Sequence, residues 1–266
     1  MRRLATFAIV VTALALAATA NAAAPRLYHA AASSTNWAGY AVSGTSFTDV
    51  KGTWVQPAAS CPARSTGYAA FWVGIGGYSG GNGGLEQIGT ESDCSSGRPT
   101  YGAWYELLPA ASISIPLAVG PGDTVSAEVS VNGSLVTLTM TDSTTGGTFT
   151  TQQTPSVLDT TSAEWIAEAP SQCSSSGRCT PLPLANFGTV QFSGSSTTAA
   201  GHVGTISDAT WSATAIQLGG GAGSALPAGL SSDGASFSVA WQRGGTVAVT
   251  TPRRVPRPVR PLRRHR

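Results

Sequence analysis

The sequence predicts an all-β protein, built as a sandwich of two packed antiparallel sheets. Only 11% of the 266 residues are charged, Gly, Ser and Thr are plentiful, and the helix-favouring residues Glu, Lys and Leu are sparse. Many short segments with strand-like patterns follow one another, separated by turn signals. Because sandwiches of about 200 to 250 residues often form one unit, we expect a single domain with little helix.

The expected strands follow in order along the body of the chain. The segment NWAGYAV at 36–42 begins the first strand, and FTDVKGTWV at 47–55 alternates as its neighbour. Turns at Pro121-Gly122-Asp123 and Asn132-Gly133 separate the clearest antiparallel strands. The remaining expected strands cover 69–77, 85–91, 101–109, 113–117, 124–131, 134–142, 149–153, 161–170, 184–192, 204–217 and 236–249.

The two ends of the chain differ from its body. Residues 1–22 carry Arg2 and Arg3, an apolar run and an A-x-A-like ending, which predicts a secretory signal peptide, with an uncleaved anchor as the alternative. A short lead covers 23–35 and the folded domain 36–250. Residues 251–266 alternate Pro and Arg, so we expect a disordered basic tail. The tail is interpreted as a solvated extension, or as a contact to anionic cell surfaces.

The net charge of +2 hides an acidic body. Five basic residues and all thirteen acidic residues of the chain lie between positions 36 and 250, a net charge of −8 there. Phosphate contacts need clustered Lys and Arg, so this body is not expected to bind nucleic acid. Because the body has few basic residues, little repulsion between positive charges builds up as its carboxylates protonate, so a protein that functions at acidic pH is plausible.

The four cysteines are Cys61, Cys94, Cys173 and Cys179. Cys173 and Cys179 close a short loop, and pairing them locally leaves Cys61 with Cys94. We expect these two disulfides, consistent with export. A zinc site is the rival interpretation, but no CxxC spacing occurs.

The stretch TSAEWIAEAP at 161–170 carries two acids in apolar surroundings. In a strand, Glu164, Ile166 and Glu168 share one face. Burial there would raise the pKa of the carboxyls, which suits them to proton transfer at mildly acidic pH. The alternative is an amphipathic helix or an edge strand with two solvated acids, and the pattern alone does not choose between Glu164 and Glu168.

Histidine counting excludes several kinds of chemistry. His202 is the single histidine between positions 36 and 250 and is expected at the surface, so a Ser-His-Asp or Cys-His arrangement would depend on it alone. A metal site of several histidines is impossible in this body, because it contains one histidine. Carboxylates, amides and aromatic side chains remain, and no metal or cofactor is expected.

Six motifs in order carry a resemblance to a known family. They are NWAGY at 36–40, FWVGIGG at 71–77, LEQIGTE at 85–91, AWYELLP at 103–109, AEWIAEAP at 163–170 and LANFGTVQF at 184–192. Together they resemble the glutamic peptidases, also called eqolisins. The resemblance implies a concanavalin- or jelly-roll-like sandwich, secretion, and hydrolysis of peptide bonds at acidic pH.

The resemblance also implies roles for single residues. It places the catalytic pair at Gln87 and Glu168, with Glu168 as general base and acid and Gln87 as donor to the oxyanion. The loop between Cys173 and Cys179 falls beside the cleft. The implied substrate groove includes Trp37, Trp72, Gly76, Gly77, Trp104, Glu106 and Glu164; core packing is the alternative for each tryptophan.

The chain departs from the family pattern at Gly76, where an acidic residue is common, and in the segment EQIGTE. A secreted module that binds carbohydrate or peptide without catalysis is the competing class. A glycosidase using Glu164 and Glu168 ranks last, because residues i and i+4 of one strand lie ~13 Å apart. We expect a monomeric enzyme acting on polypeptides, without stable membrane insertion after signal cleavage.

Overall fold

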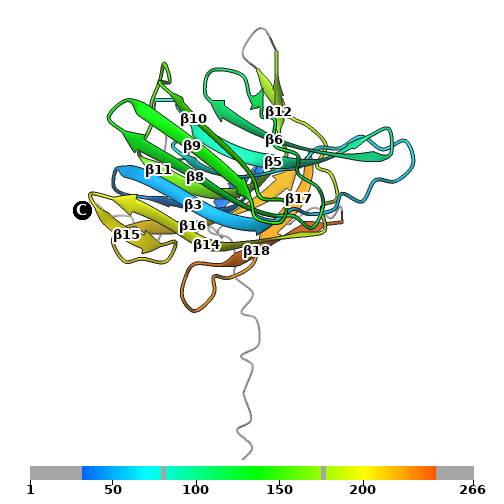
Figure 1. The fold of residues 1–266 in the computed structure, drawn as a ribbon. Coiled ribbons are helices and arrows are strands. Elements are labelled where there is room, and N and C mark those ends of the chain that lie inside the picture. Colours follow the sequence, from blue (N-terminus) through cyan, green and yellow to red (C-terminus); the bar gives the residue numbers. More distant parts are fainter. Residues whose placement is uncertain (1–31, 79–81, 175–177, 244–266) are drawn as a thin grey trace, which may run out of the picture.

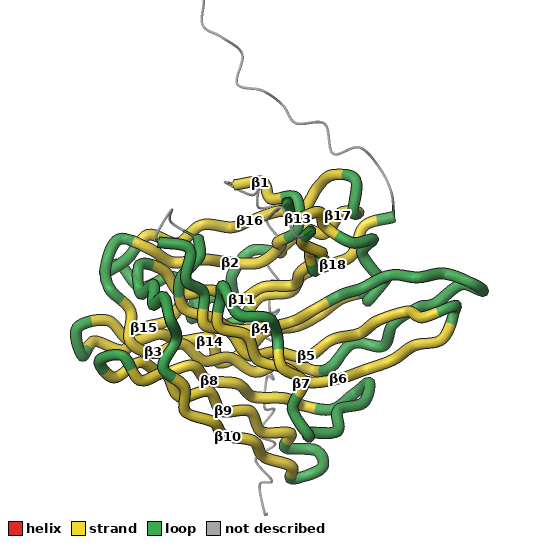
Figure 2. Tube along the Cα trace, turned by 90° about the horizontal axis from the view of Figure 1, so that it is seen from above, coloured by secondary structure: helices red, strands yellow, loops and turns green. Residues whose placement is uncertain are grey.

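The structure, a computed structural model, describes residues 32–78, 82–174 and 178–243. These residues form eighteen strands joined by turns and loops, with no helix among them (Figures 1 and 2). No helix long and apolar enough to cross a membrane is therefore found in the described ranges. The prediction of an all-β protein is confirmed.

The first sheet has the strand order β10, β9, β8, β3 and β14, with β15 beside β14 (Figure 1). Every pairing in it is antiparallel. Its strands are β3 (Phe47–Val55), β8 (Thr124–Asn132), β9 (Leu135–Asp142), β10 (Gly147–Gln153), β14 (Thr189–Ala199) and β15 (His202–Thr205).

The second sheet has the order β16, β2, β11, β4, β5, β6 and β7, with β1 parallel to β16. Its strands are β1 (Ala32–Ser34), β2 (Trp37–Ser43), β4 (Ala70–Ile75), β5 (Glu86–Ser95), β6 (Arg98–Leu107), β7 (Ile113–Ser114), β11 (Ser162–Glu168) and β16 (Ser212–Gly220). β17 (Gly223–Pro227) and β18 (Phe237–Gln242) connect the sheets into one hydrogen-bonded path. A separate hairpin pairs β12 (Ser171–Cys173) with β13 (Cys179–Pro181).

The main hydrophobic core lies between the two sheets, where β3 and β8 contact β4. Trp54 and Trp165 are its largest fully buried side chains. Each indole nitrogen is satisfied, because Trp54 donates to the Thr90 hydroxyl at 2.9 Å and Trp165 donates to the Lys51 carbonyl at 2.8 Å. A second apolar cluster around Trp72 and Ile166 covers the opposite face of the second sheet. That face carries the candidate site.

The structure corrects two expected strands. The strand expected at 184–192 begins only at Thr189, because Leu184 and Phe187 pack into the core from a loop instead of joining a ladder. The strand expected at 204–217 is two strands, β15 and β16. Asp208 interrupts it by accepting a hydrogen bond from the Thr210 N–H at 2.8 Å, a local turn contact that competes with strand pairing.

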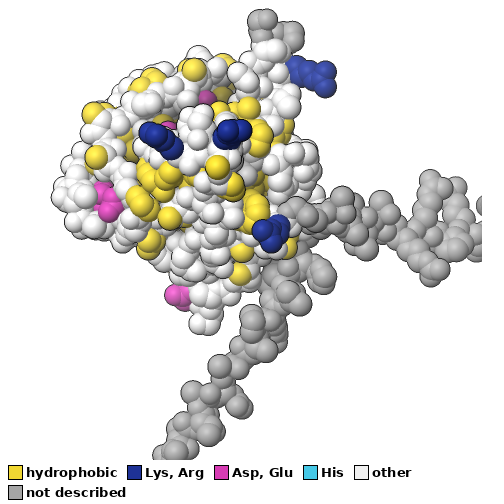
Figure 3. All heavy atoms as spheres, turned by 90° about the vertical axis from the view of Figure 1, so that its right-hand side faces the viewer, with side chains coloured by type: hydrophobic (Ala, Val, Ile, Leu, Met, Phe, Trp, Pro, Cys, Tyr) yellow, Lys and Arg dark blue, Asp and Glu magenta, His cyan; other side chains and the backbone are white. Residues whose placement is uncertain are grey.

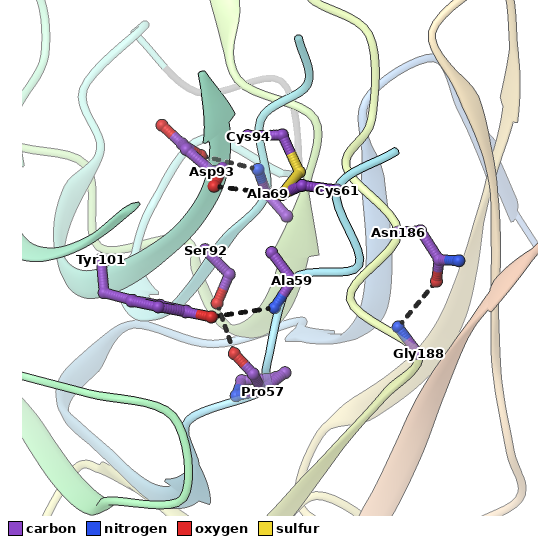
Figure 4. Close-up of a disulfide and its surroundings, with 10 residues drawn as sticks. All are labelled: Pro57, Ala59, Cys61, Ala69, Ser92, Asp93, Cys94, Tyr101, Asn186 and Gly188. Atoms are coloured by element: carbon purple, nitrogen blue, oxygen red, sulfur yellow. Dashed lines mark hydrogen bonds between the residues drawn. A yellow bond between two sulfur atoms is a disulfide. The ribbon is translucent and has the colours of Figure 1, made fainter. Parts of the chain in front are cut away.

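Both expected disulfides are confirmed. Cys61 pairs with Cys94, and Cys173 pairs with Cys179 across the β12–β13 hairpin. Figure 4 shows the first bridge beside Asp93, whose carboxylate accepts a hydrogen bond from the Ala69 N–H at 3.1 Å. The bridge therefore fastens the loop after β3 to the far end of β5.

Parts of the expected domain plan lie outside the described residues: the signal peptide, the lead up to residue 31 and the tail. The end of the lead is described and forms β1, so the described part of the sheet begins at Ala32. On the face in Figure 3, charged side chains are sparse and scattered over a largely neutral surface. Several acids of the body are instead buried: Glu86, Asp142, Asp159 and Glu164.

Candidate active site

The site is built on one face of four neighbouring strands, β11, β4, β5 and β6. Residues paired across antiparallel strands share a face, so the registers define rows of side chains across this sheet. The first row is Glu168, Ala70, Glu91 and Gly102; the second is Ile166, Trp72, Gly89 and Trp104; the third is Glu164, Gly74, Gln87 and Glu106. The expectation that Glu164, Ile166 and Glu168 share one face is confirmed.

Small residues between the functional side chains give this face its depth. A Cβ on Gly89 would lie 2.5 Å from the Phe71 carbonyl oxygen and 2.6 Å from the Trp72 Cβ, so no larger residue fits there. Trp72 is fully buried and meets Trp37 edge-on, with ring centroids 5.0 Å apart. The two indoles form an apolar wall beside Glu168.

Two donors hold the Glu168 carboxylate at the end of β11. Asn36 Nδ2 donates to Oε1 at 2.9 Å, and Trp72 Nε1 donates to Oε2 at 2.8 Å. Asn36 is itself fixed, because its backbone carbonyl accepts the Ala169 N–H at 2.8 Å and its side-chain Oδ1 accepts the Ser34 hydroxyl at 3.0 Å. Burial raises the pKa of Glu168 to about 7; the two donors oppose this rise, and the nearby Glu106 charge adds to it.

Gln87 presents its amide to the same face from β5. Its side chain is 3% exposed, and Nε2 donates to Glu106 Oε2 at 2.7 Å. The amide oxygen has no partner among the described residues. Burial raises the pKa of Glu106, and the hydrogen bond from Gln87 opposes that rise. The second N–H of the amide makes no hydrogen bond among the described residues, whereas the amide oxygen is itself buried.

A cavity of about 180 Å³ brings the expected pair together. Gln87 and Glu168 both line it, together with Trp104 and Glu106 from β6. The rest of its lining is Ala70, Glu91, Ser112, Ser114, Pro170 and Ser171. Ser171 belongs to the hairpin closed by Cys173 and Cys179, so this disulfide loop stands beside the cavity.

The structure places the other expected groove residues elsewhere. Trp37 and Gly77 line a neighbouring hollow of about 500 Å³ with Tyr78 and β1. Trp72 lies behind the cavity as a donor to Glu168. Gly76 is buried, and Glu164 is fully buried and does not reach the cavity.

Glu164 belongs instead to a group of buried acids. Glu164 and Glu86 are both 0% exposed, and Asp159 lies beside them. Burial is the main cause that raises the pKa of Glu86 to about 8 and the pKa of Glu164 well above its usual value, and the Asp159 charge adds to both. Asp159 packs against Gly76, where a Cβ would lie 2.7 Å from its carbonyl oxygen. An acidic group thus occupies the neighbourhood of position 76 although position 76 itself has none.

Sequence reasoning missed several contributors to this region. Asn36 belongs to the motif NWAGY, but the motif does not predict its hydrogen bond to Glu168. That contact depends on a strand 132 residues away in the sequence. Glu91 follows Gln87 by four residues, so strand alternation could have placed it on the same face. Glu86 gave no local signal, because its burial depends on the loop that contains Asp159.

The fold and this pair of residues define a class of protein. The sequence model of the Peptidase A4 family matches residues 35–240, so the chain belongs to this family. It is a glutamic peptidase, the group that the six motifs resemble.

Individual relatives agree with this assignment. Aspergillopepsin-2 of Aspergillus niger is 30% identical over 200 residues, which cover 66% of this chain and 69% of that protein. Scytalidopepsin B of Scytalidium lignicola is 32% identical over 182 residues, covering 65% and 67%. Scytalido-glutamic peptidase, crystallised with a transition state analog inhibitor, superposes with a TM-score of 0.68 at 27% identity, covering 78% of this chain and 98% of that chain. Aspergilloglutamic peptidase from Aspergillus niger gives 0.55 at 26% identity, covering 66% and 99%.

Proposed function

We propose that the protein is a secreted acid endopeptidase in which water attacks the peptide bond directly, assisted by Glu168 and Gln87. The observation that carries this proposal is that these two side chains, from strands far apart in sequence, line one cavity on one sheet face. A glutamine cannot titrate, so the pair supplies one proton-transfer group and one fixed amide. Peptide hydrolysis needs both functions.

Glu168 is proposed to move the protons. With its pKa raised to about 7, its carboxyl is neutral in acid and carries one O–H donor and one acceptor oxygen. As water attacks the carbonyl carbon, the acceptor oxygen takes a proton from water and the O–H gives its proton to the carbonyl oxygen. The product is a neutral tetrahedral diol, and Glu168 is again protonated.

The same group is proposed to complete the reaction. Glu168 gives its proton to the amide nitrogen as the C–N bond breaks, and one diol hydroxyl returns a proton to Glu168. The products are a carboxylic acid and an amine, and no acyl-enzyme forms. Asn36 and Trp72 support both steps, because they hold the two carboxyl oxygens in fixed directions.

Gln87 is proposed to stabilise the oxygen that gains charge in the transition state. One N–H of its amide is held by Glu106, so the other N–H has a defined direction. A preorganised donor of this kind typically contributes about 2.7–4 kcal/mol to catalysis.

An extracellular setting fits the other features of the chain. The signal-like N-terminal sequence and two disulfides are typical of exported proteins. The proposed substrates are polypeptides that bind across this cavity.

Digestion of casein at about pH 3 to 4 tests the proposal. We expect the mature protein to cleave casein, and Gln87→Ala to lower kcat by roughly 10²–10³-fold. Glu128→Gln, which changes a half-buried acid on the other sheet, serves as the control and should match the wild type. A folded wild-type protein that cleaves nothing in acid would favour the binding module instead.

A further inference from the structure

The active-site cavity contains a carboxylate that the proposed reaction does not use. Glu91 lies on β5 in the same row as Glu168, with only Ala70 between them. Adjacent strands are about 4.8 Å apart, so the two backbones are separated by roughly 10 Å across the sheet. Both side chains line the same cavity.

Gly102 makes room for the Glu91 side chain on the neighbouring strand. The two residues are paired, and a Cβ at position 102 would lie 2.8 Å from Glu91 Oε1. Any larger residue there would displace this carboxylate. The Glu91 side chain therefore lies along the cavity wall.

Nothing in the described protein compensates the Glu91 charge. No hydrogen bond to its carboxylate occurs among the described residues, and the cavity lining includes no lysine, arginine or histidine. The charged or titratable groups facing it are all acids: Asp93 on the same strand, Glu106 on β6 and Glu168 on β11.

On the basis of the proposed peptidase function, we propose that Glu91 forms a subsite for a positively charged side chain of the peptide substrate. A lysine ammonium or arginine guanidinium supplies the donors and the charge that this carboxylate lacks. A hydrogen bond between charged groups in a partly buried site is worth enough to change affinity by roughly ten-fold. Glu91 thus selects where the chain is cut, while Glu168 and Gln87 cut it.

The pH dependence of selectivity follows from the surroundings of Glu91. Burial raises the pKa of Glu91, and the Glu91 charge in turn raises the pKa of its neighbour Asp93. In strong acid the carboxyl is neutral and discriminates weakly between a cation and an apolar side chain. As the pH rises and Glu91 ionises, the preference for a cation should grow.

Paired fluorogenic peptides test this subsite. The two peptides of a pair are identical except that one carries lysine and the other norleucine at a single position, and separate pairs vary different positions on both sides of the scissile bond. For each pair, the kcat/KM of the lysine peptide divided by that of the norleucine peptide is measured at about pH 3.5 and 5.5. At one position we expect the ratio to favour lysine more strongly at the higher pH, by several-fold to about ten-fold. In Glu91→Gln the ratio should not change with pH, whereas the control Glu128→Gln should behave like the wild type.

Both kcat/KM values of a ratio are measured with the same protein sample, so a variant that is only partly active gives the same ratio. A wild-type ratio that is constant with pH at every position, or a Glu91→Gln ratio that still rises, would overturn the subsite while leaving the peptidase function intact. A wild-type protein that cleaves neither member of any pair would overturn both.

Discussion

Gln87 Nε2 donates a hydrogen bond of 2.7 Å to Glu106 Oε2, its direct partner across β5 and β6. This contact fixes the rotation of an amide that otherwise has no partner among the described residues. Glu106 is therefore a positioning residue for the proposed oxyanion donor, and it also contributes charge beside Glu168.

Replacing Glu106 should separate these two effects. Glu106→Leu removes the acceptor, and we expect kcat to fall about ten-fold or more because Gln87 loses its fixed direction. Glu106→Gln keeps an acceptor oxygen and should restore much of kcat. Both variants remove the charge, so the pKa of Glu168 should fall in both, as read from the pH profile of kcat/KM. Equal loss of kcat in both variants would contradict the positioning role.

Asn36 should tune the proton-transfer group without touching the substrate. Asn36→Ala removes the donor to Glu168 Oε1 that favours the charged form. The pKa of Glu168 should therefore rise above about 7, and the loss of kcat/KM at the alkaline end of the pH profile should move upward by about one unit. Glu128→Gln is the control. A descending limb that stays in place, or moves to lower pH, would exclude this contact as a determinant of the Glu168 pKa.

The buried acids should make the fold most stable in acid. The folded-state pKa of Glu86 is raised to about 8 and that of Glu164 is raised well above 4.5. A group with a raised folded pKa contributes stability that is complete below its unfolded value and is lost as the pH rises towards the folded value. Each such group lowers the free energy of unfolding by up to about 1.4 kcal/mol per pH unit within its own window.

Urea denaturation between about pH 3.5 and 7.5 measures this slope. The window for Glu86 runs from 4.5 to about 8, and Glu86→Gln should flatten the fall in the free energy of unfolding across it. Glu128→Gln is the control above about pH 6, because Glu128 helps to raise the pKa of Asp49 to about 6 and the pKa of Glu128 itself is lowered, so neither group affects the slope at higher pH. Stability that rises with pH across this window would contradict the burial of neutral acids.

Local patterns in the sequence predicted the all-β class, most strands, both disulfides and the shared face of Glu164 and Glu168. Strand alternation alone could not show that β11 lies between β2 and β4, because sheet neighbours are set by contacts between distant segments. The choice of Glu168 over Glu164 came from family resemblance. The structure separates the two residues by position, because loop contacts near Asp159 enclose Glu164 whereas Glu168 reaches the cavity at the strand end.

Contacts between segments that are distant in the sequence could not be predicted from local sequence patterns. Asn36 has an ordinary local context, and only the arrangement of strands brings its side chain to Glu168. The interruption at Asp208 was missed for a different reason, since a single side chain can cap a turn inside a strand-like pattern.

The most direct test compares kcat/KM for peptide cleavage in acid between Glu168→Gln and Glu164→Gln, two identical changes on one face of β11. Circular dichroism should establish that both variants are folded. We expect Glu168→Gln to lose roughly 10²–10⁴-fold, the usual contribution of a proton-transfer group, and Glu164→Gln to stay within a few-fold of the wild type. A folded Glu168→Gln that cleaves at the wild-type rate, or a folded Glu164→Gln that is inactive, would contradict the assignment of Glu168 as the reacting carboxyl.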